Sequence, residues 1–329
     1  MSVLKSTQFR KEREQSWQRL EALLSRIEQQ GIESLYESEL LELPILYRNV
    51  LSSLSVARSI SLDQNLEQYL ESLTIRAYLQ VYGIRQSFSE TAWAFFRDGF
   101  PRAFYQFRWY ILLSAALFFL GTGISFWMCL DDMENFYILM DSSTMQGRDP
   151  LATTEYLRST LYDVVEEEDE LFFFASYLFT HNSGIGILSF ITGIFGGFPT
   201  FYLIFENGLH LGAFVALFSS RGLGIDVLSW LLPHGVTEIL ALILCGASGM
   251  VLGFAVLLPG KYTRIANLQR AGRAVIPLIT GSVCLLLLAG IIEGFFRQMV
   301  TDITMRYSLA SITAFFWLGY FSLGWRKEE

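Results

Sequence analysis

The sequence predicts an all-α polytopic membrane protein with about six transmembrane helices, or five in an alternative reading, and an N-terminal cytoplasmic helical bundle. Three observations support this fold class. Hydrophobic residues make up 52% of the chain. They concentrate after residue 106 in blocks near the roughly 20 residues that one helical span needs. Basic residues flank these blocks on alternate sides, as the positive-inside rule requires. We therefore predict two domains, 1–106 and 107–329.

Residues 1–106 show the 3.6-residue periodicity of amphipathic helices and predict a three- or four-helix antiparallel bundle. The first helix carries one apolar stripe, made of Trp17, Leu20, Leu23, Leu24 and Ile27. Residues 1–110 hold thirteen basic and thirteen acidic side chains, so no basic face for nucleic acid is predicted. The aromatic segment 93–110 contains three arginines and predicts an interfacial helix along the inner membrane surface.

The first span is predicted at 107–130, after Arg97, Arg102 and Arg108, and no cleavable signal peptide precedes it. Residues 131–170 follow with twelve acidic and two basic side chains, a net charge of −10. Because basic flanks stay in the cytoplasm, this acidic loop is expected outside. The orientation places the protein in the cytoplasmic (inner) membrane with both termini in the cytoplasm.

The remaining spans are predicted at 171–193, 201–220, 233–258, 274–295 and 308–325. Four basic residues between the fourth and fifth of the six spans, and Arg326 and Lys327 after the last, fall on the cytoplasmic side. In the five-span alternative, 183–205 crosses once and 206–220 is re-entrant.

All three histidines lie in apolar, glycine-rich segments beside other polar residues. Ionisable groups at membrane depth are costly and face the bundle interior or a water-filled cavity. We expect eight such residues to form a shared polar core: His181, Asn182, Glu206, Asn207, His210, His234, Glu238 and Glu293. Glu206 and His210, like His234 and Glu238, are four residues apart and project from one helix face.

Three interpretations of this core stay open from the residues alone. The polar groups can hydrogen-bond one another and hold the helices in register. His210, His234 and Glu238 can bind a divalent metal such as zinc, with hydrolysis as a further step. Ionisable groups also mark transport or lipid-translocation routes. No catalytic nucleophile motif, phosphate-binding loop or dinucleotide fingerprint stands out, and Cys129, Cys245 and Cys284 lack metal or disulfide spacing. We therefore favour a non-enzymatic role without a cofactor.

Glycines recur at the small-x-x-x-small spacing that lets helices approach closely. The pairs are Gly193 and Gly197, Gly208 and Gly212, Gly249 and Gly253, and Gly290 and Gly294. We expect mostly intramolecular packing, with some of these positions available for a homodimer.

The order of several short motifs resembles the long form of the stage II sporulation protein M family (DUF95). The N-terminal pattern begins with Trp17, Leu20, Glu21, Leu23 and Leu24. The membrane elements are His181-Asn182, Asn207-Gly208 with Gly212, Pro233-His234-Gly235 with Glu238, and Ile292-Glu293-Gly294-Phe295. The resemblance covers nearly the whole chain.

This resemblance implies a multi-pass integral membrane protein. The short member in spore formers is a scaffold that gathers peptidoglycan-cleaving enzymes, and long members occur beside MoxR-type AAA ATPases. We therefore expect an envelope scaffold in the lipid bilayer, with other membrane or envelope proteins and a MoxR-type ATPase system as partners. A transporter, channel or scramblase and a metal-dependent membrane hydrolase are the alternatives.

Overall fold

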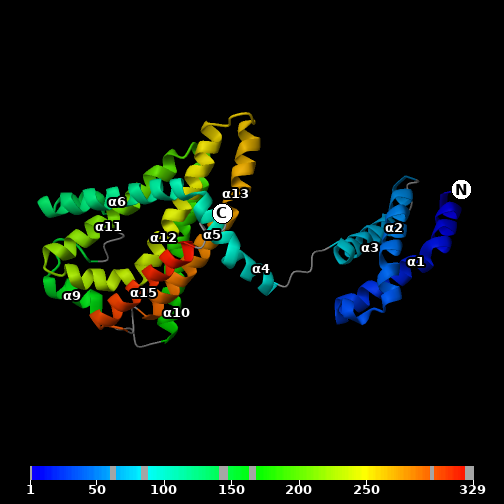
Figure 1. The fold of residues 1–329 in the computed structure, drawn as a ribbon, viewed down its shortest axis with the longest axis horizontal. Helices are drawn as coiled ribbons and strands as arrows, with labels where there is room; N and C mark the ends of the chain where they lie inside the picture. Colours follow the sequence, from blue (N-terminus) through cyan, green and yellow to red (C-terminus); the bar gives the residue numbers. More distant parts are fainter. Residues whose placement is uncertain are drawn as a thin grey trace. The chain divides into compact units, whose positions relative to one another are not determined.

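The computed structural model describes residues 2–59, 64–82, 88–140, 147–162, 168–296 and 300–322. Side chains are described in these ranges except those of residues 2–8, 88, 168–178 and 181. The described residues form helices and connecting turns, and they contain no strand. The chain divides into two compact units, Met1–Phe88 (unit 1) and Ser89–Glu329 (unit 2). The all-α fold class is confirmed (Figure 1).

Unit 1 contains three long helices around a hydrophobic core of its own. They are α1 (Ser2–Gln30), α2 (Glu37–Ser59) and α3 (Gln64–Tyr82), with a short 3₁₀ turn η1 (Ile32–Ser34) after α1. The stripe predicted on the first helix is buried, from Trp17 to Ile27, each at most 2% exposed. The Trp17 indole also donates a hydrogen bond to the Ser53 hydroxyl of α2 at 3.1 Å. The apolar stripe therefore packs α1 against its neighbours, as its spacing predicted.

Glu39, on α2, is buried beside two arginines of α1. Its carboxylate pairs with Arg26 and, at 3.2 Å, with Arg19, and it accepts a hydrogen bond from the Tyr36 amide at 3.0 Å. The hydrogen bond from Arg26, followed by that from Tyr36, lowers the pKa of Glu39 to about 2. The ionised carboxylate is thus part of the α1–α2 contact.

A lowered folded-state pKa means that the stabilisation is complete above the ordinary pKa of 4.5 and is lost as the pH falls towards about 2. We expect amide protection in residues 37–59 to fall over this window, and Glu39→Gln to remove most of the pH dependence. Hydrogen exchange of the full chain between these pH values measures it. Glu37→Gln, an exposed change in the same turn, is the control, and equal pH slopes in the two variants would contradict the prediction.

Unit 2 contains the long apolar helices. Its first segment consists of α4 (Phe88–Ala94), a π-helical turn η2 (Phe95–Gly99) and α5 (Phe100–Gln106). The long helices are α6 (Arg108–Asp131), α10 (Glu168–Ile191), α11 (Phe198–Ser220), α12 (Gly224–Leu257), α13 (Arg264–Ile291) and α15 (Ile303–Ser322). Short elements between them are α7 (Asn135–Leu139), α9 (Thr154–Tyr162), the 3₁₀ turn η3 (Thr192–Phe195) and the π turn η4 (Ile292–Phe296).

The central element of unit 2 is α12, which contacts α6, α10, α11, α13 and α15. Its segment from Ala241 to Gly253 is almost entirely apolar, and most of the side chains in that segment are buried. A helix that is hydrophobic all round belongs in the middle of a membrane bundle. The short helix α5 packs against α13 and α15, so the predicted interfacial segment makes its contacts within unit 2.

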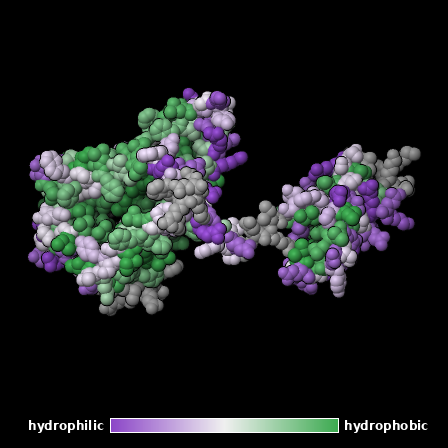
Figure 2. All heavy atoms as spheres, in the orientation of Figure 1, coloured by the Kyte–Doolittle hydropathy of each residue, from purple (hydrophilic) through white to green (hydrophobic). Residues whose placement is uncertain are grey.

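Four described helices are long and apolar enough to cross a membrane: α6, α11, α12, and α13 with η4. Hydrophobic residues also cover most of the visible face of unit 2, whereas polar and apolar residues share that of unit 1 (Figure 2). The chain is thus a polytopic helical membrane protein. Helices α10 and α15 occupy the predicted spans 171–193 and 308–325, and their crossing stays a prediction.

The helix bounds of the five-span alternative are wrong, because residues 183–205 do not form one continuous helix. Helix α10 ends at Ile191, and the chain turns at Gly196 and Gly197, with φ of 77° and 82°. Glycine adopts this left-handed conformation without the steric cost that a Cβ imposes. Pro199 then lies in the first turn of α11, where its missing N–H costs nothing. Helix α11 continues to Ser220, so 206–220 is not re-entrant.

Candidate functional site

His234 and Glu238 lie one turn apart in the first half of α12. Pro233 precedes the histidine inside the helix, and proline has no N–H for the carbonyl four residues earlier. Gly235 follows and is buried. The helix nevertheless continues through this sequence, so the two side chains keep the spacing of four residues that places them on one face.

Glu293 reaches the same place from the end of α13. The helix changes there into the π turn η4, which holds Glu293 as its second residue. A π turn inserts an extra residue in the helix and redirects the side chains around it, and such turns are frequent at functional sites. The Glu293 carboxylate lies 3.6 Å from Nε2 of His234. The two residues are 6% and 3% exposed.

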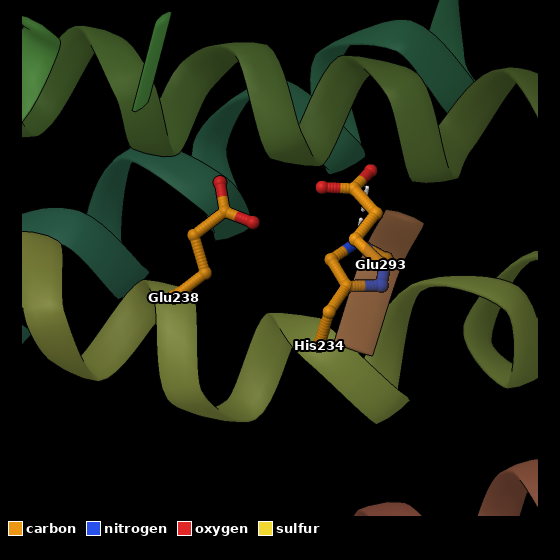
Figure 3. Close-up of side chains that lie close together, drawn as sticks. All are labelled: His234, Glu238 and Glu293. Atoms are coloured by element: carbon orange, nitrogen blue, oxygen red, sulfur yellow. Dashed lines mark ion pairs between the residues drawn. The ribbon is translucent and has the colours of Figure 1, made fainter. Parts of the chain in front are cut away.

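The three side chains of His234, Glu238 and Glu293 form one group, which we call the polar cluster. One ligand-capable atom from each lies within 4.8 Å of the others. Figure 3 shows both carboxylates and the imidazole converging on one region between two elements, with His234 and Glu238 rising from the same helix. The ring of Trp230 stands edge-on to the imidazole, with centroids 6.1 Å apart. The cluster therefore joins α12 to η4 inside the unit.

A small pocket of about 120 Å³ lies beside Glu238. Asn207 of α11 also lines it, and the remaining lining is mostly apolar, with Phe118, Leu211, Leu231, Ile239 and Leu242. Asn207 donates a hydrogen bond to the Leu203 carbonyl of its own helix at 2.7 Å. Asn207 and Glu238, predicted to share one core, thus share one cavity.

Among the other predicted core residues, Glu206 and His210 are not members of this group. Glu206 accepts a hydrogen bond from Tyr202, one turn earlier on α11, at 2.8 Å. His210 is partly buried on α11, but among the described side chains the group suited to a metal contains Glu293 in its place. Leu211 lines the pocket, and His210 lies about 100° around the helix from it. Asn182 is partly buried on α10, and the side chain of His181 lies outside the described residues.

The predicted glycines lie at helix contacts within the chain. A Cβ on Gly208 would meet the Phe118 carbonyl of α6, and one on Gly212 would meet the Thr122 carbonyl. At the turn between α10 and α11, a Cβ on Gly193 would meet the Gly249 carbonyl of α12. A Cβ on Gly253 of α12 would meet the backbone of Gly197. Gly290 and Gly294 are buried in α13 and η4. Since these positions pack inside the unit, they supply no interface for the homodimer, which stays a prediction.

A comparison with family models matches residues 114–297 to stage II sporulation protein M. This match covers more than half of the 329 residues. The chain belongs to the stage II sporulation protein M family. The family resemblance was expected over nearly the whole chain, but the match is confined to the C-terminal part. Residues 7–83, within unit 1, match a separate domain of unknown function, DUF8413. No curated protein and no solved structure matches the chain.

Every predicted core residue of this stage II sporulation protein M family member lies inside the matched segment, whereas a buried charge of unit 2 lies beyond it. Arg306 of α15 is 1% exposed and was missed in the sequence. It donates to the Val300 carbonyl at 2.7 Å and, through both terminal nitrogens, to the Leu161 carbonyl at 3.2 Å. A lone arginine at the start of a predicted span was the only available signal. Its partner is 145 residues away, and no local pattern reveals such a contact.

Proposed function

We propose that this protein is a membrane-anchored scaffold in which the helices of unit 2 hold unit 1 at the bilayer surface as a docking module. The chain is a helical membrane protein of the stage II sporulation protein M family. An exposed apolar face on unit 1 is the observation that supports the docking role.

This apolar face lies on the second half of α3 and on the neighbouring part of α2. Ile75, Tyr78, Leu79 and Tyr82 are each more than half exposed, and their spacing places them on one side of α3. Tyr47 of α2 contacts the rings of Tyr78 and Tyr82, with centroids 6.4 and 5.6 Å apart. We call these five residues the apolar face.

The same side of α3 is polar one to three turns earlier, where Gln64, Gln68 and Ser72 are exposed. The apolar residues are therefore confined to one end of the helix. An apolar patch rimmed by polar residues marks an interaction surface, and aromatic residues are enriched in the energetic centres of protein interfaces. A partner helix with its own apolar stripe is the complementary surface.

The proposal includes an orientation and a first partner. We place unit 1 and the C-terminus in the cytoplasm and the chain in the inner membrane, following the charge distribution around the spans. The family resemblance makes a MoxR-type AAA ATPase the first candidate for the apolar face, with other envelope proteins bound through unit 2.

A photocrosslinking amino acid at Leu79 of the full chain in its native membrane tests the docking module. We expect a discrete crosslinked species that Tyr82→Glu, which puts a charge into the contact, reduces at least about tenfold. The same crosslinker at Gln68, on the polar half of the same side, is the matched control. If the Leu79 and Gln68 positions give the same crosslinks, the apolar face is not a docking surface.

A further inference from the structure

Three ionisable side chains converge in the interior of unit 2, and a structural ion pair needs only two. We propose that His234, Glu238 and Glu293 bind one divalent metal ion of the zinc class. This inference is independent of the docking role of unit 1.

The three ligand-capable atoms lie close to the spacing that one metal ion requires. With metal–ligand bonds of about 2.1 Å, two ligands of one ion lie about 3.4 Å apart in a tetrahedral site and no more than about 4.2 Å in any geometry. The closest approach of His234 and Glu293 is 3.6 Å, and all three ligand atoms lie within 4.8 Å of one another. Small side-chain rotations therefore bring the three atoms onto one ion.

The charges favour a divalent cation as well. Two carboxylates that share a buried site repel each other, so either one takes up a proton or a cation lies between them. Glu293 is buried and Glu238 is partly buried, so water and salt screen the repulsion between the two carboxylates less than they would at an exposed site. With a neutral imidazole, two ionised glutamates carry a charge of −2, which one divalent ion neutralises.

The ligand types select among such ions. Imidazole nitrogen suits zinc, copper, iron and nickel, whereas sites for magnesium and calcium consist of oxygen ligands. One nitrogen and two carboxylate oxygens match the His/Glu ligands of zinc sites with three protein ligands, which keep a fourth position for water. A pocket of about 120 Å³ is lined by Glu238 of the three ligands, and it exceeds the roughly 30 Å³ that one water occupies in the liquid.

The local structure presents these ligands from two elements. His234 and Glu238 are four residues apart on α12, and Glu293 lies in the π turn after α13. A metal ion would thus link the central helix to the end of α13 at the point where regular helix geometry stops. The sequence predicted His210, His234 and Glu238 as the metal ligands, and in the structure Glu293 takes the place of His210.

The experiment uses the full chain purified in detergent, loaded with Zn²⁺ and dialysed, with metal content measured by mass spectrometry. We expect about one zinc ion per chain, and a loss of affinity of at least about tenfold in His234→Asn and in Glu293→Gln. Glu206→Gln is the matched control, since it makes the same change at a glutamate that pairs with Tyr202. This variant should bind zinc as the unaltered chain does.

A second readout, Co²⁺ absorption of the unaltered chain, keeps the test decisive if the cluster variants do not fold. A tetrahedral nitrogen–oxygen site should give visible bands of Co²⁺ that Zn²⁺ displaces in a one-to-one titration. A folded unaltered chain that gives no Co²⁺ bands and binds zinc at well below one ion per chain overturns the proposal, and so does a Glu206→Gln variant that loses zinc as the cluster variants do. The cluster would then be a proton-sharing network, and the docking role of unit 1 would be unaffected.

Discussion

Gly121→Leu in α6 is expected to lower the free energy of unfolding by about 2–3 kcal/mol, the usual cost of overpacking a close contact. A Cβ at Gly121 would lie on the Phe205 carbonyl of α11, closer than real Cβ contacts allow. Gly208 and Gly212 meet α6 from the opposite side. The two helices approach so closely that a leucine must push them apart along the whole contact.

The control for this variant is in the same helix. Gly123 is exposed, and an added Cβ there meets nothing within 4 Å. Gly123→Leu should leave stability unchanged or raise it slightly, because glycine is a poor helix former. Denaturant or thermal unfolding of both variants in the same detergent measures the difference. Equal stabilities would mean that α6 and α11 are not packed through their glycines.

Arg306→Met is expected to destabilise unit 2 by about 3 kcal/mol, since hydrogen bonds to a charged group contribute about 1.5–3 kcal/mol each. Leu161 lies in the last turn of α9, where carbonyls lack a partner in the helix. The guanidinium of Arg306 satisfies that carbonyl and places a positive charge at the negative end of α9. Methionine fills the space but leaves the buried carbonyl unsatisfied.

The loss of stability in Arg306→Met should be largest in and around α9. Tyr162, at its end, donates a hydrogen bond of 2.5 Å to Asp226 at the start of α12, and burial followed by this bond raises the pKa of Tyr162 to about 12. Limited proteolysis should therefore cut residues 147–162 faster in Arg306→Met. Arg158→Met removes an exposed arginine from α9 itself and should change neither rate nor stability. Equal cutting rates in the two variants would show that Arg306 does not hold α9.

Much of the fold could be predicted from the sequence because it depends on local patterns of residues. The stripe from Trp17 to Ile27 repeats at helical spacing, and burial of that stripe is what forms unit 1. The apolar blocks of unit 2 are as long as a bilayer is thick, so their composition alone indicates helices that can cross it. The turn between α10 and α11 depends on the left-handed conformation of Gly196 and Gly197. The predicted spans placed a break between residues 193 and 201 but did not predict this conformation.

The polar cluster could be predicted from the sequence only in part. The spacing of four residues places His234 and Glu238 together, because a helix has 3.6 residues per turn. Spacing does not say which side of α11 faces α12. The same spacing predicted that Glu206 and His210 would join the core, whereas Glu206 pairs with Tyr202 on its own helix. Glu293 reaches the cluster because it lies in the π turn η4. No local sequence pattern predicts that turn.

The sequence by itself determined the class of the protein: membrane helices, a helical N-terminal unit, a glycine-based mode of helix packing and the residues from which a buried polar site can be made. The tertiary structure alone decided which of these residues meet. Periodicity assigns each side chain to a face of its own helix, but the rotation and the pairing of the helices depend on contacts far apart in the chain. The contact of His234 with Glu293, and that of Arg306 with Leu161, are contacts of this kind.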